Sequence, residues 1–170
     1  MSRALIPVTI VTFFIVALQL SILSTLRVGG VVVMLVWLWP FTLGLAGFTT
    51  LSIWGAIVAG VFFDTHTTTP FGLTAAVGIA LAYGASRLGK EGVGDLDSAA
   101  LWVTPVLAAA AGAAAPVLYT LGGFSALNFS LWHGSLLNMI VVNAGAFFFL
   151  ARPVSRLASI VGNFGVRARR

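Results

Sequence analysis

The chain contains no cysteine and very little charge. None of its 170 residues is cysteine, only four are acidic, and 8% are charged in total. The absence of cysteine excludes disulfide bonds, thiolate metal ligands and cysteine nucleophiles. The shortage of charge excludes an ordinary soluble domain, in which about 25% of residues are charged. Because 59% of the residues are hydrophobic and the mean hydropathy is +1.08, the sequence predicts a single domain with a bilayer as its solvent.

The few acidic residues also limit the chemistry. Three of the four, Glu91, Asp95 and Asp97, fall in one polar, glycine-rich segment at 89–98. The sequence has no Gly-x-Ser-x-Gly, His-Glu-x-x-His or P-loop pattern and no paired carboxylates on one predicted helix. We therefore predict no catalytic residue, no metal and no cofactor, and a protein that is not an enzyme. The net charge of +5 lies at segment ends and in the tail, which indicates membrane orientation and anionic lipid rather than nucleic acid.

Charged residues divide the apolar sequence into six predicted helices of an all-α membrane protein. The uncharged stretch between Arg3 and Arg27 is long enough for one span, because a bilayer requires about 20 apolar residues. Longer uncharged stretches are divided at Pro40, at 122–123 and in the polar segment 125–133. The predicted helices cover residues 4–26, 30–45, 48–64, 71–88, 99–121 and 133–151. Whether the short second and third helices both span fully stays open.

Basic residues predict the orientation of these helices. Six spans place both termini on one side, where eight basic residues gather against Arg27 alone on the other side; these are Arg3, Arg87, Lys90, Arg152, Arg156, Arg167, Arg169 and Arg170. The excess predicts that both termini are cytoplasmic. The membrane domain would cover 1–151. The basic tail 152–170, with Val154, Leu157, Val161 and Phe164 at helical spacing, would be a short amphipathic helix on anionic lipid or a frayed end.

A few polar residues fall at predicted membrane depth. Asp64 ends the apolar run 53–63 and is either an intramembrane functional acid or, as we favour, an interfacial or helix-capping residue. His66 is a proton-relay or metal-ligand candidate, but a hydrogen-bonded loop histidine is the simpler interpretation. Amides in membrane helices bond across helices, which predicts that role for three residues. They are Gln19, Asn138 and Asn143.

Two further patterns concern packing. Small residues recur four positions apart in three places, which predicts close approach of helices. These are Gly55/Ala59, Ala56/Gly60 and Gly78/Ala82/Ser86. Tryptophans near predicted helix ends fit the interfacial belts of a membrane protein. These are Trp37, Trp39, Trp102 and Trp132.

The junction between the predicted third and fourth helices carries a family pattern. Gly60, Asp64, Pro70 and Gly72 stand in the order Gly-x3-Asp-x5-Pro-x-Gly, which resembles the core of the MreD family of rod shape-determining membrane proteins. The resemblance covers roughly residues 1–90, and beyond that it extends only to helix count and length. The chain departs from the family at 27–30, where members often carry a Pro-Asp pair, and at His66 and its neighbouring threonines.

The resemblance implies a non-enzymatic scaffold of the bacterial inner membrane that controls cell shape. Such proteins bind MreC, and through it RodA and a class B penicillin-binding protein, with MreB filaments on the cytoplasmic side. The implied fold is similar to the substrate-binding subunits of energy-coupling-factor transporters, which supplies the alternative function, a vitamin-binding subunit. The bulky first helix, with Ile10, Phe13 and Phe14, argues against that alternative. Which helix face binds which partner, the oligomeric state, and whether a lipid or small ligand is bound stay open.

Overall fold

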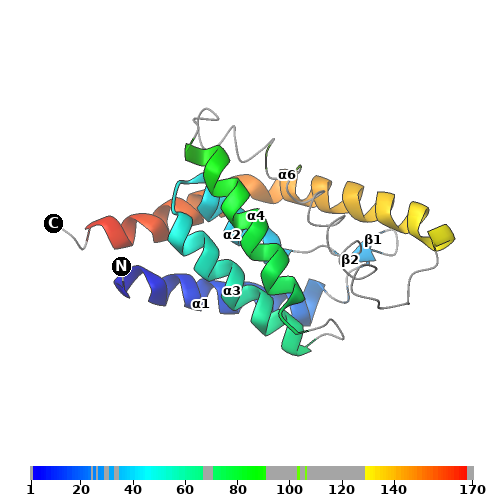
Figure 1. The fold of residues 1–170 in the computed structure, drawn as a ribbon, viewed down its shortest axis with the longest axis horizontal. Coiled ribbons are helices and arrows are strands. Elements are labelled where there is room, and N and C mark those ends of the chain that lie inside the picture. Colours follow the sequence, from blue (N-terminus) through cyan, green and yellow to red (C-terminus); the bar gives the residue numbers. More distant parts are fainter. Residues whose placement is uncertain are drawn as a thin grey trace.

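The described part of the chain is a helical bundle with one short antiparallel pair of strands. The computed structural model describes residues 2–23, 25, 27–28, 31–32, 35–66, 71–90, 103, 106 and 129–167. Its elements are α1 (Ser2–Leu18), the π-helical turn η1 (Gln19–Leu23), β1 (Arg27–Val28), β2 (Val31–Val32), α2 (Leu35–Leu45), α3 (Thr49–His66), α4 (Leu73–Lys90) and α6 (Phe129–Arg167) (Figure 1). The predicted all-α class is confirmed. The predicted helix at 99–121 lies outside the described residues, except for Val103 and Val106.

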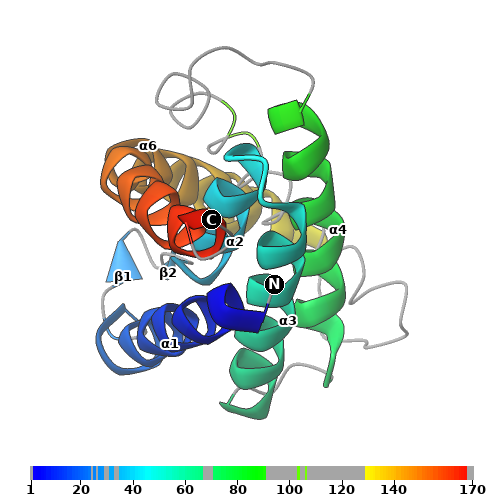
Figure 2. The same cartoon turned by 90° about the vertical axis from the view of Figure 1, so that its left-hand side faces the viewer.

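The helix α2 lies in the centre of the bundle. Figure 2 shows α2 between α6 and α1 on one side and α3 with α4 on the other. All ten residues from 36 to 45 are buried, so the segment is apolar on every side. With 11 residues α2 is about 16 Å long, because an α-helix rises about 1.5 Å per residue. This is short of the roughly 30 Å of a bilayer core.

The prediction that the second helix begins near residue 30 is wrong. Instead, Arg27–Val28 and Val31–Val32 form an antiparallel pair with Val28 opposite Val31, and α2 begins only at Leu35. The two strands are separated in sequence by a Gly-Gly pair, which is typical of two-residue hairpin turns. The alternation that marks a strand is invisible here because strands of two residues are too short to show it.

A glycine in the left-handed region ends α2. The N–H of Phe48 donates to the carbonyl of Leu43 (3.0 Å), and the N–H of Gly47 donates to that of Gly44 (2.9 Å). This pair of bonds is a Schellman cap, which needs a left-handed residue at its centre, and Gly47 has φ = 81°. The cap satisfies two carbonyls at the end of α2 and allows α3 to begin at Thr49.

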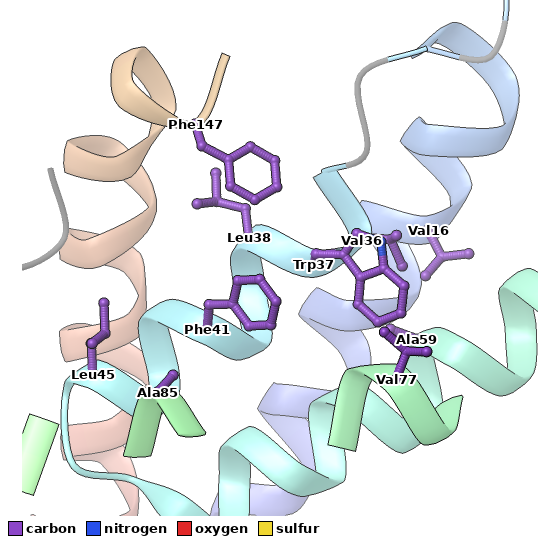
Figure 3. Close-up of a cluster of buried hydrophobic side chains, with 10 residues drawn as sticks. All are labelled: Val16, Val36, Trp37, Leu38, Phe41, Leu45, Ala59, Val77, Ala85 and Phe147. Atoms are coloured by element: carbon purple, nitrogen blue, oxygen red, sulfur yellow. The ribbon is translucent and has the colours of Figure 1, made fainter. Parts of the chain in front are cut away.

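The core is built around α2. One apolar cluster takes five residues from α2 and the rest from all the surrounding helices; its members are Val16, Val36, Trp37, Leu38, Phe41, Leu45, Ala59, Val77, Ala85 and Phe147 (Figure 3). Trp37 and Phe41 stack with their ring centroids 6.4 Å apart. A second cluster joins two other residues of α2, Trp39 and Leu43, to α1 and α6 through Ala4, Val8, Ala158 and Val161. The interfacial position predicted for Trp37 and Trp39 is therefore wrong, because both are buried.

The last helix continues through the predicted boundary between span and tail. α6 is one helix of 39 residues that passes Pro153, whereas the sequence predicts a span ending at 151. Ser155, Ala158 and Val161 are buried against the bundle, while Leu157, predicted to share an apolar face with Val154, Val161 and Phe164, is exposed. α1 and α6 run in opposite directions, so the start of α1 and the end of α6 lie at the same end of the molecule (Figure 1). Phe164 has no described side chain.

Two helices of the described part are long and apolar enough to cross a membrane, and they indicate membrane association. These are Ala4–Ile22, with 19 residues, and Ile140–Val161, with 22. Only 22% and 28% of their spans are buried, unlike the core helix of a soluble protein. Their exposed side chains are largely apolar, among them Ile6, Ile10, Phe13, Phe14, Leu18, Val141, Phe148, Phe149 and Ile160. The other four predicted spans stay predictions.

Two tryptophans bind threonines of α1. The indole N–H of Trp39 donates to Thr12 Oγ1 at 3.0 Å, and that of Trp54 donates to Thr9 Oγ1 at 2.9 Å. Each threonine hydroxyl in turn donates to a carbonyl four residues earlier in α1. The Trp39 bond is buried, whereas Trp54 is 38% exposed. These two bonds dock α1 onto α2 and α3.

The first prediction compares these two threonines. Thr12→Val removes the acceptor of a buried indole, which costs about 1–3 kcal/mol when the donor finds no other partner. Thr9→Val should cost less, because the exposed Trp54 can turn toward another acceptor. Thermal unfolding of the purified protein in detergent, followed by circular dichroism, measures the difference. Equal losses from the two variants would contradict a special role for the buried bond.

Candidate functional site

Asp64 caps the helix that follows it. The carboxylate lies in the last turn of α3 and is 4% exposed. Its Oδ2 accepts hydrogen bonds from the N–H of Gly72 at 2.8 Å and of Thr74 at 3.2 Å. These amides belong to the beginning of α4, where helical N–H groups have no partner within their own helix. Asp64 therefore serves as the capping residue that we favoured, with its negative charge at the positive end of the α4 dipole.

Two glycines allow this cap to form. A Cβ on Gly60 would overlap the backbone N and Cα of Ala75, so at this point α3 and α4 touch backbone to backbone. Gly72 has φ = 88°, a left-handed conformation that side chains disfavour. Gly60, Asp64 and Gly72 thus each have a physical reason to be the residue they are. Pro70, the fourth residue of the pattern, lies outside the described residues.

Small residues continue the contact along the full length of α4. A Cβ on Gly78 would lie 2.6 Å from the ring of Trp37, and one on Gly89 would overlap the carbonyl oxygen of Leu45. Ala82 and Ser86 are buried on the same side, whereas a Cβ on Gly84 would meet nothing within 4 Å. The close approach predicted from the small residues is confirmed at Gly60 and Gly78, and it fixes α4 against both α2 and α3, whereas a Cβ on Gly55 would meet its neighbours at ordinary distances.

Ser52 joins α3 to α2 and was not predicted. Its hydroxyl is buried and donates to the carbonyl of Pro40 at 2.7 Å. The side chain also lies 3.0 Å from where a Cβ of Gly44 would stand, so a larger residue at 44 would displace it. A serine within an apolar helix is the signal available in the sequence, but it does not reveal the acceptor.

The predicted amide contacts have different outcomes. Gln19 is buried in η1, and its Oε1 accepts from the N–H of Leu35 at 2.7 Å, so it bonds to the first residue of α2 as a contact between helices. Asn143 is buried on α6. Asn138 is exposed, which contradicts a buried contact within this chain. Gln19 and Asp64 therefore act alike, each supplying an acceptor to the start of another helix.

His66 is a hydrogen-bonded histidine at the end of α3. Its Nδ1 lies 2.9 Å from the carbonyl oxygen of Phe62 and 2.9 Å from Thr65 Oγ1. The carbonyl can only accept, so the contact with Phe62 is a hydrogen bond in the tautomer that has its proton on Nδ1. The side chain is exposed, and Asp64 beside it in sequence is buried toward α4. Within the described ranges, no three histidine or acidic side chains come together as metal ligands.

The second prediction concerns the contact at Gly60. Gly60→Ala should destabilise the protein by about 1–3 kcal/mol, because the added methyl group overlaps a backbone that cannot move without separating two helices. Gly84→Ala on α4 is the matched control, since its methyl group meets open space and Ala favours a helix over Gly. In detergent, the unfolding temperature of Gly60→Ala should be lower than that of the unmodified chain, and that of Gly84→Ala should be equal or higher. The reverse order would exclude the backbone contact.

The third prediction concerns the cap. Asp64→Ala should cost about 0.5–2 kcal/mol, the usual loss when a capping acceptor is removed. Asp64→Asn should retain most of the stability, because the amide oxygen can accept the same bonds. Hydrogen exchange of the Gly72 and Thr74 amides, measured by mass spectrometry of peptides spanning 71–90, should increase in the alanine variant alone. Unchanged exchange with Asp64→Ala would contradict capping.

No family model, curated protein or solved structure matches this chain. The resemblance to the MreD family therefore depends on the residues of the α3–α4 junction and stays a prediction.

Proposed function

We propose that this chain is a non-enzymatic membrane scaffold of the MreD type. In this proposal it crosses the bacterial inner membrane six times with both termini in the cytoplasm. It binds MreC and thereby supports lateral peptidoglycan synthesis by RodA and a class B penicillin-binding protein. The observation that carries the proposal is the α3–α4 junction, where Gly60, Asp64 and Gly72 of the family pattern meet in one capped helix contact.

The outer surface of the bundle supports a scaffold. A protein that acts by binding other membrane proteins needs apolar helix faces that its own core leaves uncovered. The helix α1 presents such a face with Ile10, Phe13 and Phe14, and Phe13 also packs edge-on against Phe62 of α3 with ring centroids 5.5 Å apart. Bulky aromatic faces of this kind offer lipid and partner helices a large apolar contact area.

The junction would act in this function through shape. Asp64 is turned inward to the amides of α4, so a partner would meet the helices that it holds together. Loss of the cap or of the Gly60 contact would separate α3 from α4 and deform every surface built on them. Binding by a scaffold requires such a preformed surface, because ordering a loose one on binding costs affinity.

The fourth prediction tests the scaffold directly. A tagged full-length chain, purified from its native membrane in mild detergent, should carry MreC with it. Gly60→Val should lose MreC because the bundle is deformed, whereas Gly84→Val, which points into open space, should retain it. Quantitative mass spectrometry of the purified complexes measures both. Recovery of a pair of ATPases without MreC would replace the scaffold with the vitamin-transporter alternative.

A further inference from the structure

Two arginines lie inside the second apolar span of the described part. Arg152 and Arg156 fall within Ile140–Val161 and are one turn apart on the exposed side of α6. Exposed apolar side chains continue beyond them toward the C-terminus, at Leu157 and Ile160. The pair is therefore enclosed on both sides by apolar surface, instead of standing at its edge.

The packing of α6 against α1 also places the two arginines inside the span and not at its end. Ala158 and Val161 share an apolar cluster with Ala4 and Val8, which begin the span Ala4–Ile22. The ends of the two spans are therefore level, and Arg152 lies about 9 Å further inside than Ala158, at about 1.5 Å of rise per residue. Charged side chains at such depth are costly in lipid, and they mark functional contacts with a group of opposite charge.

The arginines belong to a regular seam along α6. Exposed or half-exposed residues alternate at spacings of four and three, namely Asn138, Val142, Gly145, Phe149, Arg152 and Arg156. This is the spacing of the a and d positions at which two helices pack along a common seam. Around Gly145 a Cβ would meet nothing within 4 Å, so another backbone can approach there. Small and polar residues of this kind are what helix contacts in membranes use.

We propose that this seam binds the transmembrane helix of a different protein, and that this helix carries an aspartate or glutamate opposite Arg152 and Arg156. A second copy of the chain is disfavoured by charge. Two copies inserted in the same direction would meet about a two-fold axis, which places each residue near its own counterpart. Arg152 and Arg156 would then face arginines, and like charges at a contact are repulsive.

The inference rests on the membrane placement in the proposed function, but not on the identity of the partner. Among the described residues the acidic side chain is Asp64, and its carboxylate accepts hydrogen bonds from the amides of Gly72 and Thr74 at the α3–α4 junction. An acid supplied by a partner helix would give the arginine pair bidentate hydrogen bonds as well as charge neutralisation. Asn138, exposed about four turns before Arg152 on the same seam, would then add a hydrogen bond between the helices.

Photo-cross-linking from the seam tests the proposal. The photoreactive amino acid p-benzoylphenylalanine replaces Gly145 in the full-length chain in its native membrane, and replaces Gly84 of α4 as the matched control. Both glycines face open space, so neither replacement disturbs the core. The probe at 145 should give an adduct with another membrane protein, and the probe at 84 should not give that adduct. Mass spectrometry should find the cross-link in a transmembrane helix with an acidic residue within its span.

Charge variants then identify the contact. Arg152→Glu with Arg156→Glu should reduce the adduct by about tenfold or more, because attraction becomes repulsion. Arg152→Lys with Arg156→Lys should retain most of it, and exchange of the captured carboxylate for arginine should restore binding to the glutamate variant. Thermal unfolding of each variant confirms that the exposed substitutions leave the bundle folded.

Other outcomes would overturn the proposal. They are adducts with lipid alone, with a second copy of the chain, or within the chain itself, and an adduct that the glutamate variants leave unchanged. Failure of the proposed function is distinct. If MreC co-purifies with the chain but the glutamate variants leave the adduct at 145 unchanged, the scaffold stands and the seam falls. If the captured acidic helix belongs to a protein unrelated to cell-wall synthesis, the seam stands and the scaffold falls.

Discussion

Helices that begin inside an apolar bundle need acceptors for their first N–H groups, and the rest of this structure depends on how they are supplied. An unpaired backbone amide in such surroundings costs several kcal/mol. Asp64 supplies the acceptor for α4, and Gln19 supplies it for α2. At the other end of α2, Gly47 closes the Schellman cap. The buried polar side chains thus complete the backbone of the neighbouring helix, which is what allows the short α2 to lie entirely within the core.

The cap on α4 explains the spacing of the Gly-x3-Asp pattern. Residues four apart lie on the same face of a helix, so Gly60 and Asp64 both face α4. An aspartate side chain is short and reaches the amides of α4 only if the two helices are nearly in contact. Gly60 provides that approach one turn earlier, where its missing side chain lets Ala75 touch the backbone of α3. The capping bond and the close contact therefore require each other, and neither residue alone would hold the junction.

The sequence predicted α3 and α4 to within two residues at each end, but not the start of α2 or the end of α6. Asp64 and Pro70 interrupt the apolar sequence at the junction, so the position of the junction can be found in the sequence. The start of α2 and the continuation of α6 past 151 could not be found there, because a helix buried all round has no periodicity and a proline on an exposed face need not end a helix. The acceptors of Trp39 and Ser52 were also hidden, since a hydroxyl or indole in an apolar run does not reveal its partner until the helices are packed.

The continuity of α6 also changes the meaning of its arginines. A tail that leaves the membrane at 152 would place Arg152 and Arg156 in water, where basic residues only bias orientation. A helix that continues, with Ser155, Ala158 and Val161 buried against α1 and α2, places them beside apolar surface. Removing these two residues from the eight counted on the side of the termini leaves six against Arg27, so the remaining basic residues predict the same orientation. The same two residues then have a different role, because a charge within a span requires a partner of opposite charge while a charge at its edge does not.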